Sequence, residues 1–594
     1  MKKTIATLLA LCTGAVMFVL LLGSMKNDSA TFDETAHIAA GFGYVTQLDY
    51  RLNPEHPPLI KALAALSGQL FTKPYFPTTV PSWQEYNQNR WWLQFDQGRA
   101  FLYESGNDAD RIIFWTRIPI LLVSLLLGWI LFLWTQTHYG SRTALLALLL
   151  YAFSPTVLAH SRYVTTDIAA SLGFFLGLIV FLRFLEKPAA RTILLAGLTF
   201  GAAQLLKFSL IMLIPIYGIL LIAWVYTRPN LQIRERFGLL GNLIVKTITL
   251  GVVGMVLVWV VYAPFVWNYP KERQLADAIS QLSTNSARPL VAFDLALIQN
   301  RFTRPLGEYF LGVLMANQRA AGGNTAFFLG EVSSKGSRLY FPLLYIVKES
   351  LVFHILTIIA LFASWRRWRA SPPASKSSRA RIRIWTYNHF PEFSMIALIS
   401  FYWLISITSP LNIGIRHVLP TFPFIYILVA RGCSIWLSET KRILITPIKY
   451  AVTSVLLLWL TIETAITYPH FLSYYNILAG GTDNGYIIAT DSNYDWGQDF
   501  YRLTKFVRDN AIEHIAIDYF GGASPAYYLG DVYEPWWSAK GPPSGWFAIS
   551  VNALQGARAN IGPGFSRKPE DSYEWLNGHE PVARAGMSIF IYEF

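Results

Sequence analysis

The chain has 594 residues, of which 53% are apolar and 14% are charged, and its mean hydropathy is +0.35. Soluble domains carry nearer a quarter charged residues, so the composition excludes an ordinary soluble globular protein. The net charge of +13 would suit a nucleic-acid partner, but the basic residues gather in short loops between apolar runs, which argues against one.

The apolar residues form runs of about 20, long enough to cross a hydrocarbon core about 30 Å thick. Such runs must be helical because lipid offers the backbone no hydrogen-bond partners. We therefore expect a mainly α, polytopic membrane protein with about eleven transmembrane helices. The expected spans are 4–24, 111–136, 142–159, 166–185, 190–206, 208–227, 243–264, 341–364, 394–410, 415–436 and 447–468.

Charge asymmetry predicts the orientation of these spans. Lys2 and Lys3 precede the first run and place the N-terminus in the cytoplasm. Alternation then puts the strongly basic short loops inside, including the loop 365–393. Their basic residues are Arg228, Arg234, Arg236, Arg366, Arg367, Arg369, Lys376, Arg379, Arg381, Arg383, Lys441 and Arg442. The first run is longer than a signal-peptide core and no A-x-A site follows it, which predicts a retained anchor in a bacterial inner membrane.

Three large segments, 25–110, 265–340 and 469–594, then lie on the non-cytoplasmic side. The last combines short apolar alternations, such as 546–551, with Gly/Pro turns, which is typical of a small α/β domain. We expect a transmembrane domain over 1–468 and this α/β domain over 469–594.

The first outer segment carries acidic residues close to the membrane. Asp33 and Glu34 follow soon after the anchor, and Glu55 and His56 precede a Pro-Pro pair. The run 59–66 is helical in period but too short to span, so it is expected to lie along the interface. These residues are predicted to surround one membrane-proximal cavity. The alternative is a solvated loop with helix caps.

Further ionisable residues occur at expected helix ends on the same side. Asp167 would begin the fourth helix, where a carboxylate also suits the helix dipole as a cap. Ionisable side chains in or beside apolar runs are energetically costly and usually have a function. Here they are Lys207, Lys348, Arg416 and His417. Together such cations would form a site for a lipid phosphate. For the lysines, the alternative is snorkelling to the interface.

The segment Asp491-Ser-Asn493-Tyr-Asp495-Trp496 has the D-x-N-x-D spacing of a calcium loop. Trp496 stands where such a loop needs glycine, and Arg502 stands where it needs the terminal glutamate, which argues against calcium. The remaining interpretations are a carbohydrate or acceptor contact with Trp496 as platform, and a purely structural turn.

These motifs in this order resemble bacterial members of the protein O-mannosyltransferase-like superfamily. The family comprises glycosyltransferase family 39 proteins of GT-C fold, related to the lipid A aminoarabinose transferase. The motifs are Asp33-Glu34, Asn53-Pro-Glu-His-Pro-Pro-Leu59, Ser154-Pro155 with Thr166-Asp167, Gly414-Ile-Arg-His417 and Asp491-Ser-Asn-Tyr-Asp-Trp-Gly497. The resemblance extends over nearly the whole chain.

The resemblance implies inverting transfer of a sugar from a polyprenyl-phosphate carrier to a hydroxyl of a glycan, lipid or protein on the outer side. It implies Asp33 as the leading catalytic base, Glu34 as its neighbour, and Asp167, which matches the acidic residue of the second outer loop, as a further catalytic carboxylate. Glu55 matches the family's acidic residue before Pro-Pro. His56 replaces a lysine frequent in the aminoarabinose branch, and no MIR-type insertion occurs in 265–340, which weakens the case for a protein acceptor.

The chemistry fits these residue types independently. A hydroxyl needs a carboxylate to take its proton, the departing phosphate needs cations, and single-step inversion needs only one base. No cofactor is required, although Glu55 and His56 offer ligand types for a divalent metal. The alternative functions are a transporter or lipid-linked sugar flippase, disfavoured by acids at helix ends instead of the midplane, and a sugar-binding protein using the C-terminal domain.

Overall fold

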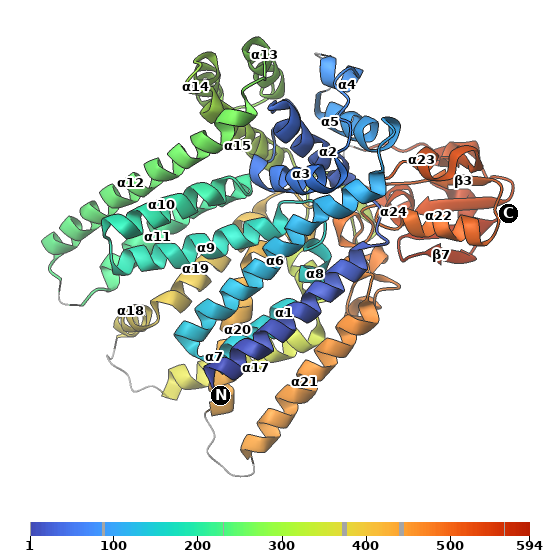
Figure 1. Cartoon of the computed structure of the whole chain (residues 1–594). Coiled ribbons are helices and arrows are strands. Elements are labelled where there is room, and N and C mark those ends of the chain that lie inside the picture. Colours follow the sequence, from blue (N-terminus) through green and yellow to red (C-terminus); the bar gives the residue numbers. More distant parts are fainter. Residues whose placement is uncertain (1, 86–89, 230, 371–376, 439–444, 563–564) are drawn as a thin grey trace.

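A computed structural model describes residues 2–85, 90–229, 231–370, 377–438, 445–562 and 565–594. Three residues used to predict orientation, Lys376, Lys441 and Arg442, lie outside these ranges. Figure 1 shows long helices running side by side, with shorter helices across one end and a small sheet beside that end.

Within the described ranges, nine helical segments are long and apolar enough to cross a membrane. They are α1 (Lys3–Met25), α6 (Ala109–Tyr139), α9 (Asp167–Glu186), η3 (Phe208–Met212) with α11 (Leu213–Thr227), α12 (Ile233–Phe265), α17 (Leu351–Ala370), α19 (Phe390–Thr408), η5 (Leu419–Thr421) with α20 (Phe422–Ser438), and α21 (Ile445–Thr467). The mainly helical, polytopic architecture predicted from the apolar runs is confirmed.

The other two expected spans are shorter helices. The run 142–159 is divided into α7 (Ser141–Ala152) and α8 (Pro155–His160). Pro155 causes the break because proline lacks an N–H and disfavours helix at the preceding residue; the Ser154 hydroxyl caps α8 by accepting from the Val157 N–H at 3.2 Å. The run 190–206 forms α10 (Ala190–Gln204), which at 1.5 Å per residue is about 22 Å long. Neither α7 nor α10 alone matches the bilayer thickness.

The expected span 341–364 also differs from a single helix. It consists of α16 (Tyr340–Lys348) followed by α17, with a break at Glu349 and Ser350. The start of the expected span 415–436 is not α-helical either, because 415–417 form the 3-10 turn η4 (Ile415–His417). These two breaks place Lys348 and Arg416 at helix ends instead of inside continuous spans.

The two long loops after α1 and α12 fold into helices that cover one end of the bundle, called here the loop end (Figure 1). These helices are α2 (Phe32–Phe42), α3 (Pro58–Thr72), α4 (Pro81–Gln84), α5 (Arg90–Arg99), α13 (Lys271–Gln281), α14 (Arg288–Gln299) and α15 (Arg304–Gly322). The expected interfacial helix corresponds to α3, and Leu66, Leu70 and Phe71 on it are exposed. An open apolar face of this kind suits a helix lying in a membrane interface.

The opposite end of the bundle, called here the basic end, contains the last turn of α17 and the helix α18 (Ser378–Asn388) (Figure 1). Arg367 and Arg369 lie in that last turn, Arg366 directly precedes it, and Arg379, Arg381 and Arg383 lie on α18. The large loops and the most basic loop are therefore at opposite ends, as the predicted alternation requires.

The C-terminal part forms a five-stranded sheet of order β4-β3-β5-β8-β7. Its strands are β3 (Ile515–Asp518), β4 (Tyr533–Pro535), β5 (Trp546–Ser550), β7 (Ala583–Ala585) and β8 (Ile589–Glu593), with helices α22 (Phe500–Asp509), α23 (Pro525–Leu529) and α24 (Val551–Arg558). β3 pairs in parallel with β4 and β5, whereas β8 pairs antiparallel with β5 and β7. The domain boundary near residue 468 stays a prediction.

A second sheet and a buried ion-pair cluster are among the contacts that join this part to the rest of the chain. This sheet, of order β1-β2-β6, pairs β2 (Glu331–Ser333) with β1 (Ala326–Phe328) and with β6 (Asn560–Ile561). The buried Asp28, just after α1, pairs with Arg502 of α22 at 2.8 Å and with Arg162 at 2.9 Å. The first outer loop and the C-terminal sheet are thus held together beside the loop end.

Candidate active site

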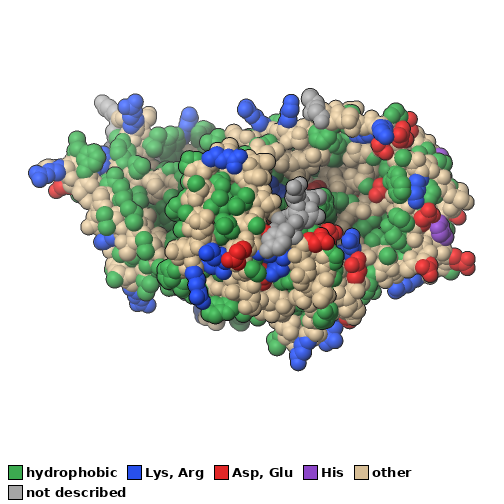
Figure 2. Space-filling model, turned by 90° about the horizontal axis from the view of Figure 1, so that it is seen from above, with side chains coloured by type: hydrophobic (Ala, Val, Ile, Leu, Met, Phe, Trp, Pro, Cys, Tyr) green, Lys and Arg blue, Asp and Glu red, His purple; other side chains and the backbone are tan. Residues whose placement is uncertain are grey.

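A cavity of about 450 Å³ opens beneath the helices of the loop end. Figure 2, which views this face, shows it hollowed near the centre with acidic and basic side chains beside the hollow. Its polar lining comes from segments far apart in the chain: Asp33, His37, Glu55, His56, Asp167, Lys207, Arg319, Arg416 and His417. The rest of the lining is largely apolar. The volume and the few convergent polar groups are those of a small-molecule site.

Asp33 reaches the cavity from the first turn of α2. Thr31 precedes this helix and forms a capping box with Glu34, which fixes where the helix begins. The Asp33 side chain is 25% exposed, and its Oδ2 lies 2.9 Å from Arg416 Nη1. Asp33 therefore presents a carboxylate to the cavity with one cation beside it.

Glu34 points the other way and is fully buried. Its two oxygens accept from Arg117 Nε at 2.8 Å and from Arg117 Nη2 at 2.6 Å, and the Val164 N–H donates to Oε1 at 2.9 Å. Glu34 does not line the cavity. The predicted acidic pair is thus divided: Asp33 faces the cavity and Glu34 joins α2 to α6 and to the segment before α9.

Asp167 is the first residue of α9 and only 2% exposed. Lys207 Nζ lies 2.6 Å from its Oδ1, and Arg416 Nη1 lies 3.5 Å from its Oδ2. Two cations therefore surround this carboxylate, whereas Asp33 has one. This arrangement makes Asp167 the residue that holds Lys207 and Arg416 in the cavity wall.

Arg416 is the centre of this cluster. Burial lowers the pKa of its guanidinium, but the carboxylates of Asp33, Asp167 and Asp491 outweigh burial and raise it, so Arg416 stays charged. Its guanidinium stacks on the Trp496 ring at 4.2 Å, a cation–π contact. The Ile415 N–H also donates to Asn493 Oδ1 at 2.9 Å. The segment 491–497 thereby sets the position of Arg416.

The expected site residues Asp491, Asn493, Asp495 and Trp496 lie behind Arg416 and do not line the cavity. Asp495 is buried and accepts from the N–H groups of Asn552 and Gly497 at 2.8 and 3.2 Å. Burial raises the pKa of Asp491 to about 6 and that of Asp495 to about 7. Of the interpretations left open for this motif, the geometry favours a structural turn that supports Arg416.

Glu55 and His56 are held in the wall by residues that sequence reasoning missed. The buried Lys61 ammonium donates to the carbonyls of Asn53 and His56 at 2.9 and 2.8 Å and to Asn53 Oδ1 at 2.8 Å. Glu55 accepts from Trp91 Nε1 at 3.1 Å and from Arg319 Nη1 at 3.3 Å. Lys61 therefore holds the backbone of the Asn53–His56 turn, and Trp91 and Arg319 hold the Glu55 side chain.

The His56 ring packs edge-on against His37 with 4.9 Å between ring centroids. Burial lowers the pKa of both imidazoles, and for His56 the neighbouring His37 and Lys61 lower it further. Both rings are thus neutral near pH 7. Across the described part of the chain, no group of three His, Cys, Asp or Glu side chains is arranged to hold a metal. With Glu55 engaged by Arg319 and Trp91, the arrangement does not fit the divalent metal for which this pair offered ligands.

Lys348 is not brought to the cavity. Its buried ammonium donates to the carbonyls of Leu472, Tyr474 and Asn493 at 2.8, 2.6 and 2.7 Å. Lys348 therefore ties α16 to the chain beyond α21. The sequence analysis did not identify Arg117 and Lys61 as site residues, although the sequence does set them apart. Each is a charged residue within an apolar helical run, where such residues are expected to have a specific partner. Trp91 and Arg319 are not set apart in this way, since they come from the two long loops.

The helical bundle and its apolar spans are those of a multi-pass membrane protein, and a charged cavity opens at one end of it. Residues 110–259 match the family model described as dolichyl-phosphate-mannose-protein mannosyltransferase. This match covers about a quarter of the chain and agrees with the resemblance expected from the motifs. No curated protein sequence matches it.

Several solved structures are similar at low sequence identity. ArnT from Cupriavidus metallidurans bound to undecaprenyl phosphate is 12% identical, with 98% of this chain and 97% of that chain covered, at a TM-score of 0.43. The apo Archaeoglobus fulgidus oligosaccharyltransferase is 13% identical, with 93% and 71% covered, at 0.47. The S. cerevisiae protein O-mannosyltransferase Pmt1-Pmt2 complex bound to the sugar donor is 20% identical, with 44% and 33% covered, at 0.31.

Proposed function

We propose that this chain is an inverting glycosyltransferase that moves a sugar from a polyprenyl-phosphate-sugar donor onto a hydroxyl acceptor, with Asp33 as general base. The observation that carries the proposal is the pairing, in one cavity, of a partly exposed carboxylate with two cations. Asp33 is 25% exposed, and Arg416 and Lys207 line the same wall. The chemistry of this class needs a base and a phosphate site within reach of one sugar.

The donor phosphate would be bound by Arg416 and Lys207. Both are charge-assisted donors already gathered on Asp167, and a phosphate offers further acceptors to such donors. The adjoining wall contains Phe208, Ile211 and Met212, which suit the first isoprene units of a carrier. As the phosphate departs it gains charge, and the same two cations stabilise that charge in the transition state.

Asp33 would take the proton of the acceptor hydroxyl. In the structure its Oδ2 is held by Arg416 at 2.9 Å. A donor phosphate competes for the same guanidinium, so donor binding would release Asp33 at the moment when a base is needed. Of the two outward carboxylates, Asp167 is too enclosed by Lys207 and Arg416 for this role.

The acceptor would enter between the two long loops. A second hollow of about 640 Å³ adjoins the cavity there and shares Glu55, Trp91 and Arg319 with it. Trp91 offers a ring for sugar stacking and Glu55 an oxygen for a hydroxyl. A glycan, a lipid or a protein side chain would meet these groups before reaching Asp33.

The cavity would face the periplasm or cell exterior of a bacterial inner membrane. The positive-inside rule supports this orientation because the basic residues of α17 and α18 lie at the end away from the cavity. The C-terminal α/β part would then lie outside the membrane, beside the cavity entrance.

Mass spectrometry of cell-envelope lipids and glycans tests the proposal. Cells that lack the protein should lose one sugar modification, and cells that carry the Asp33→Asn variant at normal membrane abundance should lose it too. Identical envelopes in all three strains would refute a transferase. Reconstituted protein that moves a lipid-linked sugar across vesicles without forming a glycosidic bond would establish the flippase alternative.

A further inference from the structure

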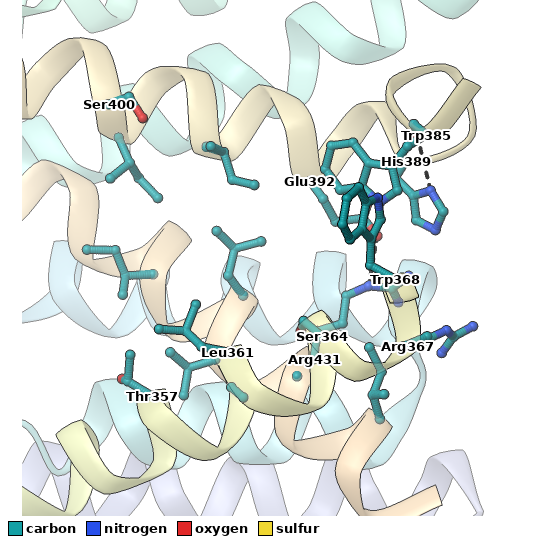
Figure 3. A pocket seen from close by; sticks show the side chains of 18 of the residues that line it. Thr357, Leu361, Ser364, Arg367, Trp368, Trp385, His389, Glu392, Ser400 and Arg431 are labelled. Atoms are coloured by element: carbon teal, nitrogen blue, oxygen red, sulfur yellow. Dashed lines mark hydrogen bonds and ion pairs between the residues drawn. The ribbon is translucent and has the colours of Figure 1, made fainter. Parts of the chain in front are cut away.

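A larger cavity, of about 920 Å³, lies between α17, α18, α19 and α20 at the basic end. Its lining begins at the first residues of α19, including Glu392 and Ile396, whereas the candidate active site is lined by the last turn of α19 and the residues after it. The groove thus extends along α19 as far as Trp403 and also meets α16, but its charged end lies at the start of α19, away from the candidate active site. Figure 3 shows this groove with aromatic and charged side chains gathered at one end.

The middle of the groove is apolar and open to the surroundings. Leu361 on α17 is 66% exposed and Ile396 on α19 is 44% exposed, and both line it. In a membrane protein, exposed apolar side chains at this depth of a spanning helix contact hydrocarbon. The groove between α17 and α19 is thus shaped and lined to receive an acyl chain.

The end of the groove that lies toward α18 is aromatic and cationic. The Arg381 guanidinium lies 4.1 Å from the centre of the Trp368 ring and donates to the Trp368 carbonyl, and Trp385 and Arg367 complete this end. Trp residues at the end of a spanning helix mark the headgroup level of a bilayer. The apolar middle of the groove would therefore face the acyl chain of a phospholipid, and its basic end would face the headgroup.

The charge balance at this end favours an anion. Glu392 also lines the groove, but its Oε1 lies 2.7 Å from Arg431 Nε, so these two charges compensate one another. By formal charge, the described lining has the three arginines Arg367, Arg381 and Arg431 against Glu392, so it is positive as a whole. A phosphate with a net negative charge complements them, whereas a headgroup carrying its own ammonium gains less.

We propose that this groove is a binding site for an anionic phospholipid of the leaflet at the basic end. One acyl chain lies between α17 and α19, and the phosphate meets Arg367 and Arg381. The occupant is not the sugar donor, because a donor phosphate bound here would stand at the far end of α19 from Asp33. The site would fix α18 against the membrane, and it holds whether or not the proposed transferase activity does.

Native mass spectrometry of the full chain in detergent, with added phosphatidylglycerol or phosphatidylcholine, tests the site. The wild type should retain phosphatidylglycerol preferentially. The double variant Arg367→Gln/Arg381→Gln should bind it roughly thirtyfold more weakly, on the scale of two basic residues acting on an anionic headgroup. Arg379→Gln is the matched control, since Arg379 lies exposed on α18 and outside the groove lining. Equal binding of the two lipids by the wild type, or an equal loss in the control, would overturn the proposal.

A second pair of variants tests the acyl part without touching any charge. Ile396→Trp fills the groove and should reduce phosphatidylglycerol retention at least several-fold, whereas Ile396→Ala widens it and should retain the lipid. Equal retention by these two variants would mean that the lipid lies elsewhere on the surface, which also overturns the proposal. This pair remains decisive if the double arginine variant does not fold.

Discussion

Arg416 Nη1 lies 2.9 Å from Asp33 Oδ2, although the two residues are 383 positions apart in the chain. The same nitrogen lies 3.5 Å from Asp167, which also pairs with Lys207. Two carboxylates and two cations thus balance one another in this part of the cavity wall. Any phosphate that enters must take cations from carboxylates, and this exchange couples donor binding to the state of Asp33.

Asp33→Asn is expected to lower the turnover of purified enzyme by about 10²–10⁴, because the amide cannot accept the hydroxyl proton. Donor affinity should be unchanged or tighter, since Arg416 loses a competing carboxylate. Steady-state rates and donor binding by titration separate the two effects.

Asp531→Asn, an exposed residue of the C-terminal part, is the control for the same chemical change. Near-normal turnover of Asp33→Asn would remove Asp33 from the role of base. A loss of donor binding in that variant, without a loss of turnover at saturation, would instead make Asp33 a donor contact.

The two lysines first grouped as donor contacts are expected to behave differently. Lys207→Met should raise the donor KM, because Lys207 lines the cavity at 2.6 Å from Asp167. Lys348→Met should lower the thermal stability instead, because three buried carbonyls lose their donor. Donor titrations and melting temperatures in detergent should give opposite rankings for the pair, and a raised donor KM for Lys348→Met alone would contradict the geometry.

Much of the architecture could be predicted because lipid imposes it. Apolar runs had to be helices, and basic loops had to share one side, so the long spans and the opposite placement of loops followed from simple physical rules. Where prediction failed, the cause was local. Pro155 divides one expected span, and the ends at Lys348 and Ile415 depend on buried partners supplied by residues 472–493.

The candidate site was predicted only in part, because motifs identify residues but not the direction in which their side chains point. Motifs could identify Asp33, Glu55, Asp167, Lys207 and Arg416 as chemistry-bearing residues, and all five line the cavity. The motifs favoured Asp33 as the base, but they could not say which way a side chain turns at the start of α2, so the division of roles between Asp33 and Glu34 stayed open. The partner that decides this, Arg117, comes from α6 and is 83 positions away.

The Glu34–Arg117 pair is expected to be a main source of stability at the loop end. Glu34→Gln leaves the Arg117 charge buried without its counter-ion, and such changes cost about 3–5 kcal/mol. The double variant Glu34→Gln/Arg117→Met should recover part of that loss, since no charge then remains unpaired. Thermal unfolding in detergent measures all three proteins. Asp96→Asn, in the exposed pair with Arg99, is the control and should change little.

Acid pH is expected to destabilise the protein through the cavity histidines. Burial lowers the pKa of His37 and His56 below the unfolded value of about 6.5, so below that pH the unfolded chain binds more protons than the folded one. Stability is therefore complete above about pH 6.5 and falls as the pH falls, by at most about 1.4 kcal/mol per pH unit for each histidine. Burial raises the pKa of Asp491 and Asp495, which act in the opposite direction, so the comparison must be made between variants.

His56→Gln should flatten the decline in melting temperature between pH 7 and pH 5, because glutamine binds no proton in either state. His514→Gln is the matched control, since the His514 ring is 55% exposed and pairs with Glu534 far from the cavity. An identical pH slope in the wild type and the His56→Gln variant would show that His56 is not held neutral by burial. The neutral pair His37 and His56 would then no longer account for a cavity wall whose charge comes from its carboxylates and from Arg416, Lys207 and Arg319.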